Sequence, residues 1–394
     1  MNVILFDDES RYTLFPLTLT RPTADIRIGI LKISEKWEAY FEGNTGFKTE
    51  SYLQKKYPYT IAEQNLFING SLLPNEQLLA VINSLEDGDF LTKEGVLLAA
   101  KLSQANAALF NGEILKDAKT VDYTGELNKL TFPEDIFSKN HQQIETDFEL
   151  LTKGRQSAKL SNTNTLIGDR IFIEEGVEAE CSNFNTKNGP IYLGKNAQVW
   201  EGSNLRGGIA LCHDSQVKMG TRVYGGTTIG PMSRVGGEIN NAVIFGYSSK
   251  GHDGYLGNAV VGEWCNFGAD SNNSNMKNNY AEVKIWDYTK ERFRKTGLQF
   301  CGLIMGDHSK CGINTMFNTG TVVGVSANIF GAGFPRVFIP DFAWGGAHGF
   351  EHYALNKAIE TAKLAYERKG RLFDDVEKDI FAYIYNYTEK LRRF

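Results

Sequence analysis

The densest group of reactive side chains lies in segment 250–257, which reads Lys-Gly-His-Asp-Gly-Tyr-Leu-Gly. His252 stands between Gly251 and Gly254, so we expect it on an exposed turn. A histidine titrates near neutral pH and can take a proton from an attacking amine that lies within hydrogen-bonding reach. A packed or solvated histidine stays open as the alternative, because most loop histidines have no catalytic role.

The residues that would position this turn follow a period of six. Aliphatic residues stand at Val199, Leu205, Leu211, Val217, Val223, Ile229 and Val235, and the period returns at Met305, Cys311, Phe317, Val323 and Ile329. Neither a helix, which repeats near 3.6 residues, nor a strand, which repeats at 2, produces such a period. A β-helix does, because each face of each coil adds one aliphatic residue to an interior column. The sequence therefore predicts a left-handed parallel β-helix of hexapeptide repeats.

Two stretches interrupt the period. It is irregular over 240–255, and over 272–296 it gives way to a polar segment that contains Lys277, Lys284 and Arg294. Insertions in solenoids form loops on one face, which is often the face that binds a ligand. Beyond residue 353, apolar residues recur at helical spacing, so we expect two amphipathic helices that cap the last coil.

The N-terminal region differs in pattern from the repeats. Strand-like runs at 3–6 and 66–68 alternate with helical patterns at 30–41 and 76–85, which is typical of an α/β domain. Residues 132–151 read as a helical connector. We therefore predict an α/β domain over 1–152, a β-helix domain over 153–340 and a helical cap over 341–394.

Composition excludes several classes of partner. The net charge of −5 and a pI near 5.8 give no polybasic signature, so we expect no nucleic acid partner. No apolar run approaches the length of a membrane span, and the acidic residues after Val3–Phe6 favour a first β-strand over a signal peptide. The five cysteines lack a CxxC pair, which favours free thiols in a reducing cytoplasm. We expect a cytoplasmic protein without a metal site.

Segment 251–275 closely resembles the acetyltransferase domain of a bacterial bifunctional family. That family joins glucosamine-1-phosphate N-acetyltransferase to N-acetylglucosamine-1-phosphate uridylyltransferase and makes UDP-N-acetylglucosamine. Its pattern is Gly-His-x-x-Tyr-x-Gly-Asp, followed by Asn-x-Gly-Ala-Gly and a downstream Asn. The matching residues are Gly251, His252, Tyr255, Gly257, Asn266, Gly268, Ala269 and Asn275.

The resemblance implies a role for each matching residue. His252 would deprotonate the amine of the sugar, while Tyr255, Asn266 and Asn275 would hold the sugar. Arg222 would bind the phosphate, for which the planar fork of a guanidinium is well suited. Gly268 and Ala269 would face acetyl-CoA, whose pantetheine arm lies between subunits of the family's homotrimer.

Four departures from the family pattern leave the exact amino sugar open, and one of them is an insertion rich in Lys and Arg that is longer than expected. Asn240 stands where the family has a lysine that contacts substrate, Asn258 replaces an aspartate, and Asp270 replaces the last glycine of Gly-Ala-Gly. Lys277 or Lys284 is a candidate for the missing positive charge.

The N-terminal region resembles the family's nucleotidyltransferase half more weakly. Segment 16–22, Pro-Leu-Thr-Leu-Thr-Arg-Pro, is similar to a segment of that superfamily, so Arg11 and Arg21 are candidates to contact a nucleotide phosphate. Asp7, Asp8 and Glu9, however, stand where glycines would cradle the phosphate, and carboxylates repel it unless a metal intervenes. Mg²⁺ is therefore expected only if this domain is active, and a degenerate or structural domain is the alternative.

These observations support a first hypothesis and two alternatives. The first is an acetyl-CoA-dependent N-acetyltransferase that acts on an amino-sugar 1-phosphate in nucleotide-sugar biosynthesis, with or without a nucleotidyltransferase activity. The second is mainly a sugar-1-phosphate nucleotidyltransferase with a trimerising β-helix. The third is a non-catalytic sugar-binding assembly protein.

Overall fold

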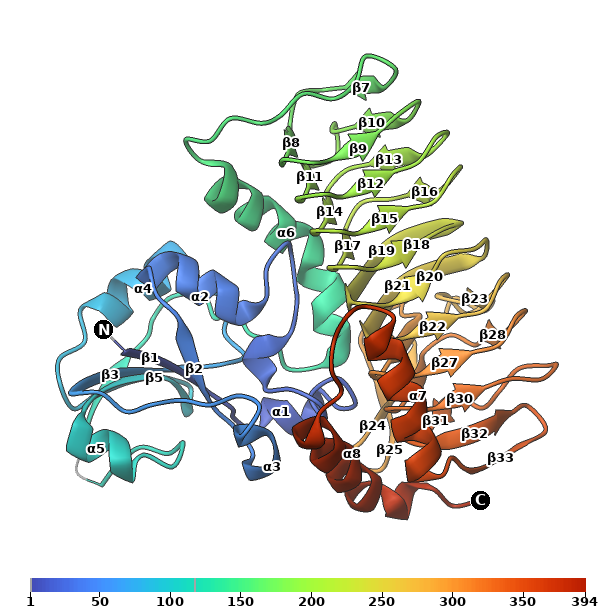
Figure 1. Cartoon of the computed structure of the whole chain (residues 1–394). Helices are drawn as coiled ribbons and strands as arrows, with labels where there is room; N and C mark the ends of the chain where they lie inside the picture. The colour runs from blue at the N-terminus through green and yellow to red at the C-terminus, as the bar shows by residue number, and fades with distance from the viewer. Residues whose placement is uncertain (1, 117) are drawn as a thin grey trace. The chain divides into compact units, whose positions relative to one another are not determined.

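The computed structural model describes residues 2–116 and 118–394, which form two compact units (Figure 1). The first unit runs from the N-terminus to Leu14 and adds Thr20–Ile26 and Leu31–Phe132. The second contains Phe15–Leu19, Arg27–Ile30 and Pro133–Phe394. The predicted domain boundaries stay a prediction.

The first unit is built on a mixed six-stranded sheet in the order β2-β1-β3-β5-β4-β6. Its strands are β1 (Asn2–Phe6), β2 (Thr45–Lys48), β3 (Gln64–Asn69), β4 (Asp89–Lys93), β5 (Val96–Ser103) and β6 (Lys119–Asp122). Strand β1 is parallel to both β2 and β3, and its Ile4 and Phe6 belong to the apolar core. The carboxyl end of β1 therefore places Asp7 and Asp8 at one edge of the sheet.

Short helices complete the first unit. They are α1 (Ser10–Thr13), α2 (Ile33–Phe41), α3 (Ser51–Gln54), α4 (Glu76–Asn83), α5 (Gln104–Leu109) and the 3-10 helix η1 (Thr23–Asp25). Helix α4 begins where the side chain of Asn75 accepts a hydrogen bond from the backbone N–H of Leu78, which supplies a cap for the first turn. Helices α2 and α4 lie where helical periodicity was expected.

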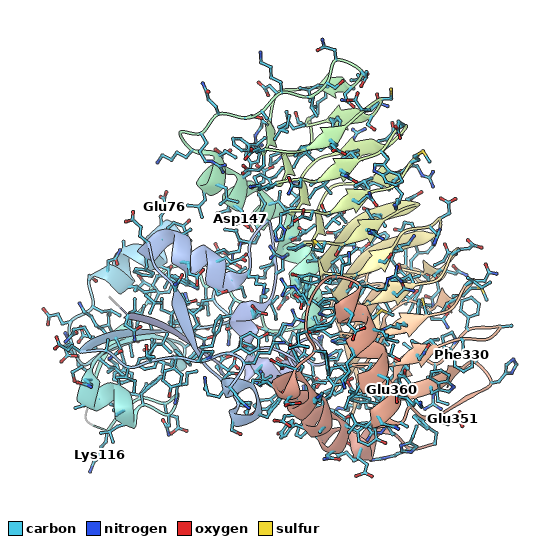
Figure 2. All side chains as sticks on the ribbon, in the orientation of Figure 1. Glu76, Lys116, Asp147, Phe330, Glu351 and Glu360 are labelled. Atoms are coloured by element: carbon cyan, nitrogen blue, oxygen red, sulfur yellow. The ribbon has the colours of Figure 1, made fainter. Side chains whose placement is uncertain are left out.

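The second unit opens with the long helix α6 (Pro133–Thr152) and continues into the coils of a parallel β-helix. Asp147 of α6, labelled in Figure 2, accepts a hydrogen bond of 2.8 Å from the backbone N–H of Ile30. This contact explains why residues 27–30 belong to the second unit.

Each coil places strands on three faces. The first face has β7 (Thr165–Ile167), β10 (Asn183–Asn185), β13 (Asn204–Arg206), β16 (Arg222–Val223), β23 (Asn272–Asn273) and β28 (Met316–Phe317). The second has β8 (Ile171–Ile173), β11 (Ile191–Leu193), β14 (Ile209–Leu211), β17 (Thr227–Ile229), β26 (Leu303–Met305), β29 (Thr321–Val323) and β31 (Phe338–Ile339). The third has β9 (Glu178–Ala179), β12 (Gln198–Val199), β15 (Gln216–Val217), β18 (Arg234–Val235), β20 (Ser249–Lys250), β22 (Asn266–Phe267), β27 (Lys310–Cys311), β30 (Asn328–Ile329) and β32 (Ala343–Gly346), with β33 (Gly349–His352) antiparallel to β32.

The residues of the six-residue period fill the interior of the β-helix. Val199, Leu205, Leu211, Val217, Val223, Ile229 and Val235 are each at most 1% exposed and belong to one apolar cluster. Met305, Cys311, Phe317, Val323 and Ile329 continue the same cluster. The predicted fold class, an α/β domain followed by a left-handed parallel β-helix and C-terminal helices, is confirmed.

The irregularity at 240–255 has a structural cause. Strands β19 (Glu238–Gly246) and β21 (Tyr255–Glu263) are each nine residues long and pair in parallel along their length, from Glu238–Tyr255 to Gly246–Glu263. Strand β19 pairs with both β16 and β17, so it runs through the first and second faces without a full turn between them. The second interruption contains an antiparallel hairpin of β24 (Lys284–Asp287) and β25 (Arg292–Lys295).

The chain ends in α7 (Leu355–Glu367), α8 (Asp375–Tyr387) and the 3-10 helix η2 (Glu389–Leu391). Figure 1 shows α7 beside strands of the third face, and Lys369, just beyond α7, donates a hydrogen bond of 2.9 Å to the carbonyl oxygen of Met232. Among the helices of the described residues, none is long and apolar enough to cross a membrane.

Candidate functional site

A buried lysine lies behind the turn that carries His252. Lys250 pairs in register with Val235 and occupies an interior position, where it is 2% exposed. Its ammonium nitrogen donates hydrogen bonds to the carbonyl oxygens of Gly236 (2.9 Å), His252 (3.0 Å) and Gly254 (2.8 Å). The buried ammonium of Lys250 thereby fixes the backbone around the turn through three hydrogen bonds.

The environment of Lys250 also changes its acidity. Burial lowers the pKa of Lys250 to about 8, and the carboxylate of Asp253 opposes this effect. The sequence pattern did not reveal this role, because a lysine at an aliphatic position of the period reads as a break in the repeat. The signal was present, since the register of the repeat assigns position 250 to the interior.

The imidazole of His252 is exposed on the turn between β20 and β21, as the flanking glycines predicted. A side chain in this place can reach a ligand bound outside the coil. Its role as a general base stays a prediction.

Tyr255 begins β21 on the first face and lies in a polar network. Its hydroxyl accepts hydrogen bonds from the side-chain amides of Asn275 (2.8 Å) and Asn240 (3.5 Å), and Asn275 also donates to Asn258 Oδ1 (2.8 Å). Burial raises the pKa of Tyr255, so the phenol stays neutral at physiological pH. The structure thus joins two expected sugar-binding residues to two of the departures from the family pattern, Asn240 and Asn258.

Local packing fixes the ring of Tyr255. The backbone N–H of Tyr255 donates to Asn272 Oδ1 (2.7 Å), and the backbone N–H of Gly257 donates to Asn273 Oδ1 (2.9 Å). A Cβ atom at Gly257 would lie 2.2 Å from the Tyr255 hydroxyl oxygen. Glycine at 257 is therefore needed for the ring to lie where it does.

Arg222 lies in the same row of the first face as Tyr255. The register pairs Arg222 with Glu238 and Glu238 with Tyr255, so two inter-strand steps separate the arginine from the tyrosine. The Arg222 Nε lies 3.3 Å from Glu238 Oε2, and the arginine side chain is 53% exposed. One of its five N–H donors faces Glu238, and the exposed part of the guanidinium can meet an anion.

Gly268 and Ala269 form the corner that follows β22. Because β20 pairs with β22, Ala269 occupies on its coil the corner position that His252 occupies on the preceding coil. A Cβ atom at Gly268 would lie 2.3 Å from the backbone of Gly312, so the close stacking of these coils requires glycine there. The two predicted cofactor-contacting residues are therefore near His252 in the register of the coils.

Two predicted substrate-binding residues lie elsewhere. Asn266 is on the third face, where it lines a cavity beneath α7, whereas Tyr255 is on the first face. The ammonium of Lys277 donates to the carbonyl oxygen of Glu282 (3.0 Å) within the insertion. Within one chain, neither side chain joins the Tyr255 network, and their proposed contacts with substrate stay predictions.

The basic insertion is held by an ion pair that the sequence did not reveal. The Arg294 guanidinium forms two hydrogen bonds, of 2.5 and 2.6 Å, with the carboxylate of Glu134 in α6. Both side chains are largely buried, at 12% and 5% exposure. At least one arginine of the insertion therefore stabilises the fold of the second unit.

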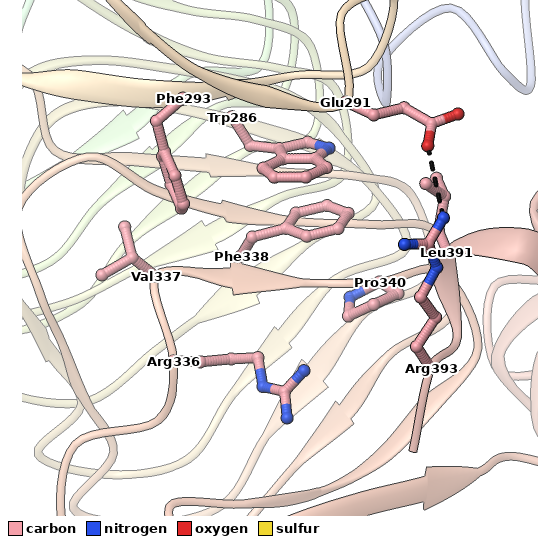
Figure 3. A pocket seen from close by; sticks show the side chains of 9 residues that line it. All are labelled: Trp286, Glu291, Phe293, Arg336, Val337, Phe338, Pro340, Leu391 and Arg393. Carbon is pink, nitrogen blue, oxygen red and sulfur yellow. Dashed lines mark ion pairs between the residues drawn. The ribbon is translucent and has the colours of Figure 1, made fainter.

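The insertion also forms part of an apolar cavity of about 490 Å³. Figure 3 shows Trp286 stacked on Phe338, with a ring-centroid distance of 4.2 Å, and Arg336 on another side of the cavity. Arg393 closes one end through an ion pair with Glu291. Nothing in the sequence pattern pointed to this cavity.

In the first unit, the candidate phosphate-binding arginines are buried. Arg11, 1% exposed, donates to Asp7 Oδ2 (3.2 Å), to the carbonyl oxygen of Arg21 (3.0 Å) and to the Tyr52 hydroxyl (2.7 Å). Arg21, 2% exposed, lies 3.9 Å from the carboxylate of Asp25. Both arginines contact carboxylates of their own unit, and phosphate binding by Arg11 and Arg21 stays a prediction.

Asp8 at the end of β1 is also paired. It accepts hydrogen bonds from Lys129 (2.5 Å) and Asn69 (2.8 Å). Burial tends to raise the pKa of Asp8, but the charge and hydrogen bond of Lys129 outweigh burial, so its pKa is lowered. Across residues 2–116 and 118–394, no group of three or more His, Cys, Asp or Glu side chains is placed to hold a metal ion.

Comparison with known proteins adds to this geometry. Residues 3–156 match the family described as sugar nucleotidyl transferase. The chain is 32% identical over 87 residues to "Bifunctional protein GlmU" of Methanocaldococcus jannaschii, a match that covers 22% of this chain and 21% of that protein. The chain is similar to the GlmU-like bifunctional family. The resemblance stated from the sequence is thereby confirmed.

A second GlmU-like relative gives a similar match. The bifunctional sugar-1-phosphate nucleotidylyltransferase/acetyltransferase of Sulfurisphaera tokodaii is 31% identical over 93 residues, which is 24% of this chain and 23% of that protein. The chain thus spans less than a quarter of the length of these curated relatives. A hexapeptide transferase family protein from Anaplasma phagocytophilum is 15% identical over 57% of this chain and 92% of its own, with a TM-score of 0.23. The assignment of the β-helix fold therefore depends on the strand pairings described above and not on this likeness.

Proposed function

We propose that this chain is an acetyl-CoA-dependent N-acetyltransferase that acts on an amino-sugar 1-phosphate. The observation that carries the proposal is the exposed His252 on a turn that Lys250 holds from the interior, beside the network of Tyr255 and Asn275. The similarity to GlmU-like bifunctional proteins supports the same chemistry.

The chain's residues would divide the reaction as follows. The amine nitrogen of the sugar attacks the thioester carbonyl carbon, and His252 accepts the proton that the nitrogen loses. A C–N bond forms and the C–S bond of the thioester then breaks. The imidazolium gives its proton to the departing thiolate. The products are the N-acetylated sugar phosphate and free CoA.

The substrates would bind to side chains of the first face and of the corner at Ala269. Tyr255 and Asn275 present a hydroxyl and an amide that can bond to sugar hydroxyls, and Arg222 provides the cation for the phosphate. Acetyl-CoA would lie along the corner of Ala269, where Ile313 on the next coil is 69% exposed and offers apolar surface to the pantetheine arm. We infer that the enzyme is a cytoplasmic homotrimer in which a neighbouring subunit completes this cleft.

One assay tests the proposal. Purified protein is mixed with acetyl-CoA and a panel of amino-sugar 1-phosphates, and release of the free CoA thiol is measured. We expect turnover with one of these sugars and its loss in His252→Ala at an unchanged melting temperature. A folded protein that releases no thiol with any amino sugar would overturn the proposal.

The family match at residues 3–156 favours a second activity, sugar-1-phosphate nucleotidyl transfer. At the end of β1, Asp7 pairs with Arg11 and Asp8 with Lys129, so a Mg²⁺ ion bound there would have to displace these cations. Pyrophosphate release from nucleoside triphosphates, with Mg²⁺ and with acetylated or unacetylated sugar 1-phosphates, separates the two activities. If both assays are silent while a sugar phosphate still binds, the chain is a sugar-binding assembly protein.

A further inference from the structure

A cavity of about 370 Å³ lies between the third face of the β-helix and α7. Arg234 and Lys310 enter it from the coils, and Arg368 and Lys369 enter it from the segment that follows α7. Among the residues that line it, none is an aspartate or a glutamate. We propose that this cavity binds the pyrophosphate group of a small molecule.

The β-helix supplies one wall as a regular row. Arg234 pairs with Ser249, Ser249 with Asn266, and Asn266 with Lys310, and the residue after each of them points into the interior. Three inter-strand steps separate the α-carbons of Arg234 and Lys310 by roughly 14 Å. Cations at both ends of such a row, with a hydroxyl and an amide between them, suit a dianionic group longer than a single phosphate.

The segment after α7 supplies the opposite wall. Besides the hydrogen bond from Lys369 to Met232, the guanidinium of Arg371 lies over the ring of Tyr247 at 4.7 Å, and both Met232 and Tyr247 line the cavity. The basic segment Arg368–Arg371 is therefore held against the coils at two points, which keeps its cations at the cavity.

Two of the four cations in the cavity have no carboxylate partner within the part of the chain that the structure describes. Among the described residues, Arg234 and Arg368 have no carboxylate within ion-pairing distance. Burial and the charges of Arg234 and Arg368 lower the pKa of Lys369, which Asp214 only partly offsets, and burial lowers the pKa of Lys310. Because the chain carries a net charge of −5, this gathering of cations is a local feature that a bound anion would stabilise.

The aromatic residues of the cavity leave no free ring face on which a nucleobase could stack. Trp264 lines the cavity, but Tyr247 and Tyr366 stack on it at ring-centroid distances of 4.4 and 4.0 Å. Its ring faces are therefore already covered, and the recognised group is the pyrophosphate rather than a nucleobase. The cavity lies on the third face, whereas Tyr255 lies on the first, so this site is separate from the sugar site proposed above.

Isothermal titration of the full chain with inorganic pyrophosphate tests the site. We expect binding to the wild type and at least about tenfold weaker binding to R234Q/K310Q, because two charge-assisted contacts are lost. The control R206Q/K187Q removes two exposed cations outside the cavity and should bind as the wild type does. No binding to the wild type, or equal weakening in both variants at unchanged melting temperatures, would overturn the proposal.

Two further arms identify the source of the pyrophosphate. Displacement of pyrophosphate by CoA, or by a nucleoside diphosphate, supports the site and shows which molecule occupies it. Binding that persists in His252→Ala supports a site independent of acetyl transfer, so the failure of either proposal can be recognised without the other. Inorganic phosphate that binds as tightly as pyrophosphate would contradict the two-point arrangement of the cations.

Discussion

The ammonium nitrogen of Lys250 lies 3.0 Å from the carbonyl oxygen of His252, in the interior of the β-helix behind the turn that exposes the imidazole. The same nitrogen also binds the carbonyl oxygens of Gly236 and Gly254. A buried charge thus holds the backbone of the segment in which the residue types indicate acid–base chemistry.

Replacing Lys250 with methionine is expected to lower the kcat of acetyl transfer about 10- to 100-fold with a small change in KM, since the turn loses its three contacts and His252 is misplaced. Methionine suits an interior aliphatic column, so the variant should fold. Steady-state kinetics with acetyl-CoA and the preferred amino sugar measure the effect. A wild-type kcat in a folded Lys250→Met protein would show that the turn needs no such support.

The same residue makes stability depend on pH. Because the folded-state pKa is about 8 and the ordinary value is 10.5, the unfolded chain holds a proton between these values that the folded chain has released. Stability therefore rises with pH across this window, by about 3 kcal/mol. Urea unfolding of the wild type and Lys250→Met at several pH values should show a steeper rise in the wild type, because the lowered pKa values of Lys310 and Lys369 act in both proteins. Equal slopes would refute the contribution of Lys250.

Removing the imidazole should abolish most acetyl transfer. We expect His252→Ala to lower kcat about 10²- to 10⁴-fold, the usual contribution of a general base. Since the side chain is exposed, the melting temperature should stay unchanged. Measured turnover within twofold of the wild type, on the order of experimental scatter, would remove His252 from the mechanism.

A methyl group at position 257 should displace the tyrosine ring. The added Cβ would lie 2.2 Å from the Tyr255 hydroxyl, so Gly257→Ala must move the ring away from Asn275. We expect KM for the amino sugar to rise about tenfold, the effect of one lost hydrogen bond. Gly43→Ala, where a Cβ would meet only the Phe41 carbonyl oxygen at an ordinary contact distance of 3.9 Å, is the matched control and should leave KM unchanged.

The ion pair between Arg294 and Glu134 should matter for stability rather than for catalysis. Arg294→Gln leaves a buried carboxylate without its partner and is expected to cost about 3–5 kcal/mol in unfolding free energy. Replacing both residues with apolar ones should cost less than the single change. If the double variant is instead the less stable one, the pair contributes more than it loses through desolvation.

The sequence predicted the β-helix because its interior is built locally. Nearly every sixth residue of a coil is apolar and fills the interior column, so the period itself predicts the fold, and Val199 and Val235 lie in the interior as expected. The sequence also placed His252 on an exposed turn, since glycines on both sides favour a bend there.

Only the tertiary structure decided which side chains meet. Arg294 and Glu134 are 160 residues apart, Lys250 fills a column where its neighbours are apolar, and Asn266 faces α7 rather than Tyr255. These contacts depend on how coils of unequal length stack and on where an insertion and a terminal helix return to them. Whether two residues far apart in the sequence meet depends on the geometry of all the turns between them, and the local spacing of residue types does not predict it.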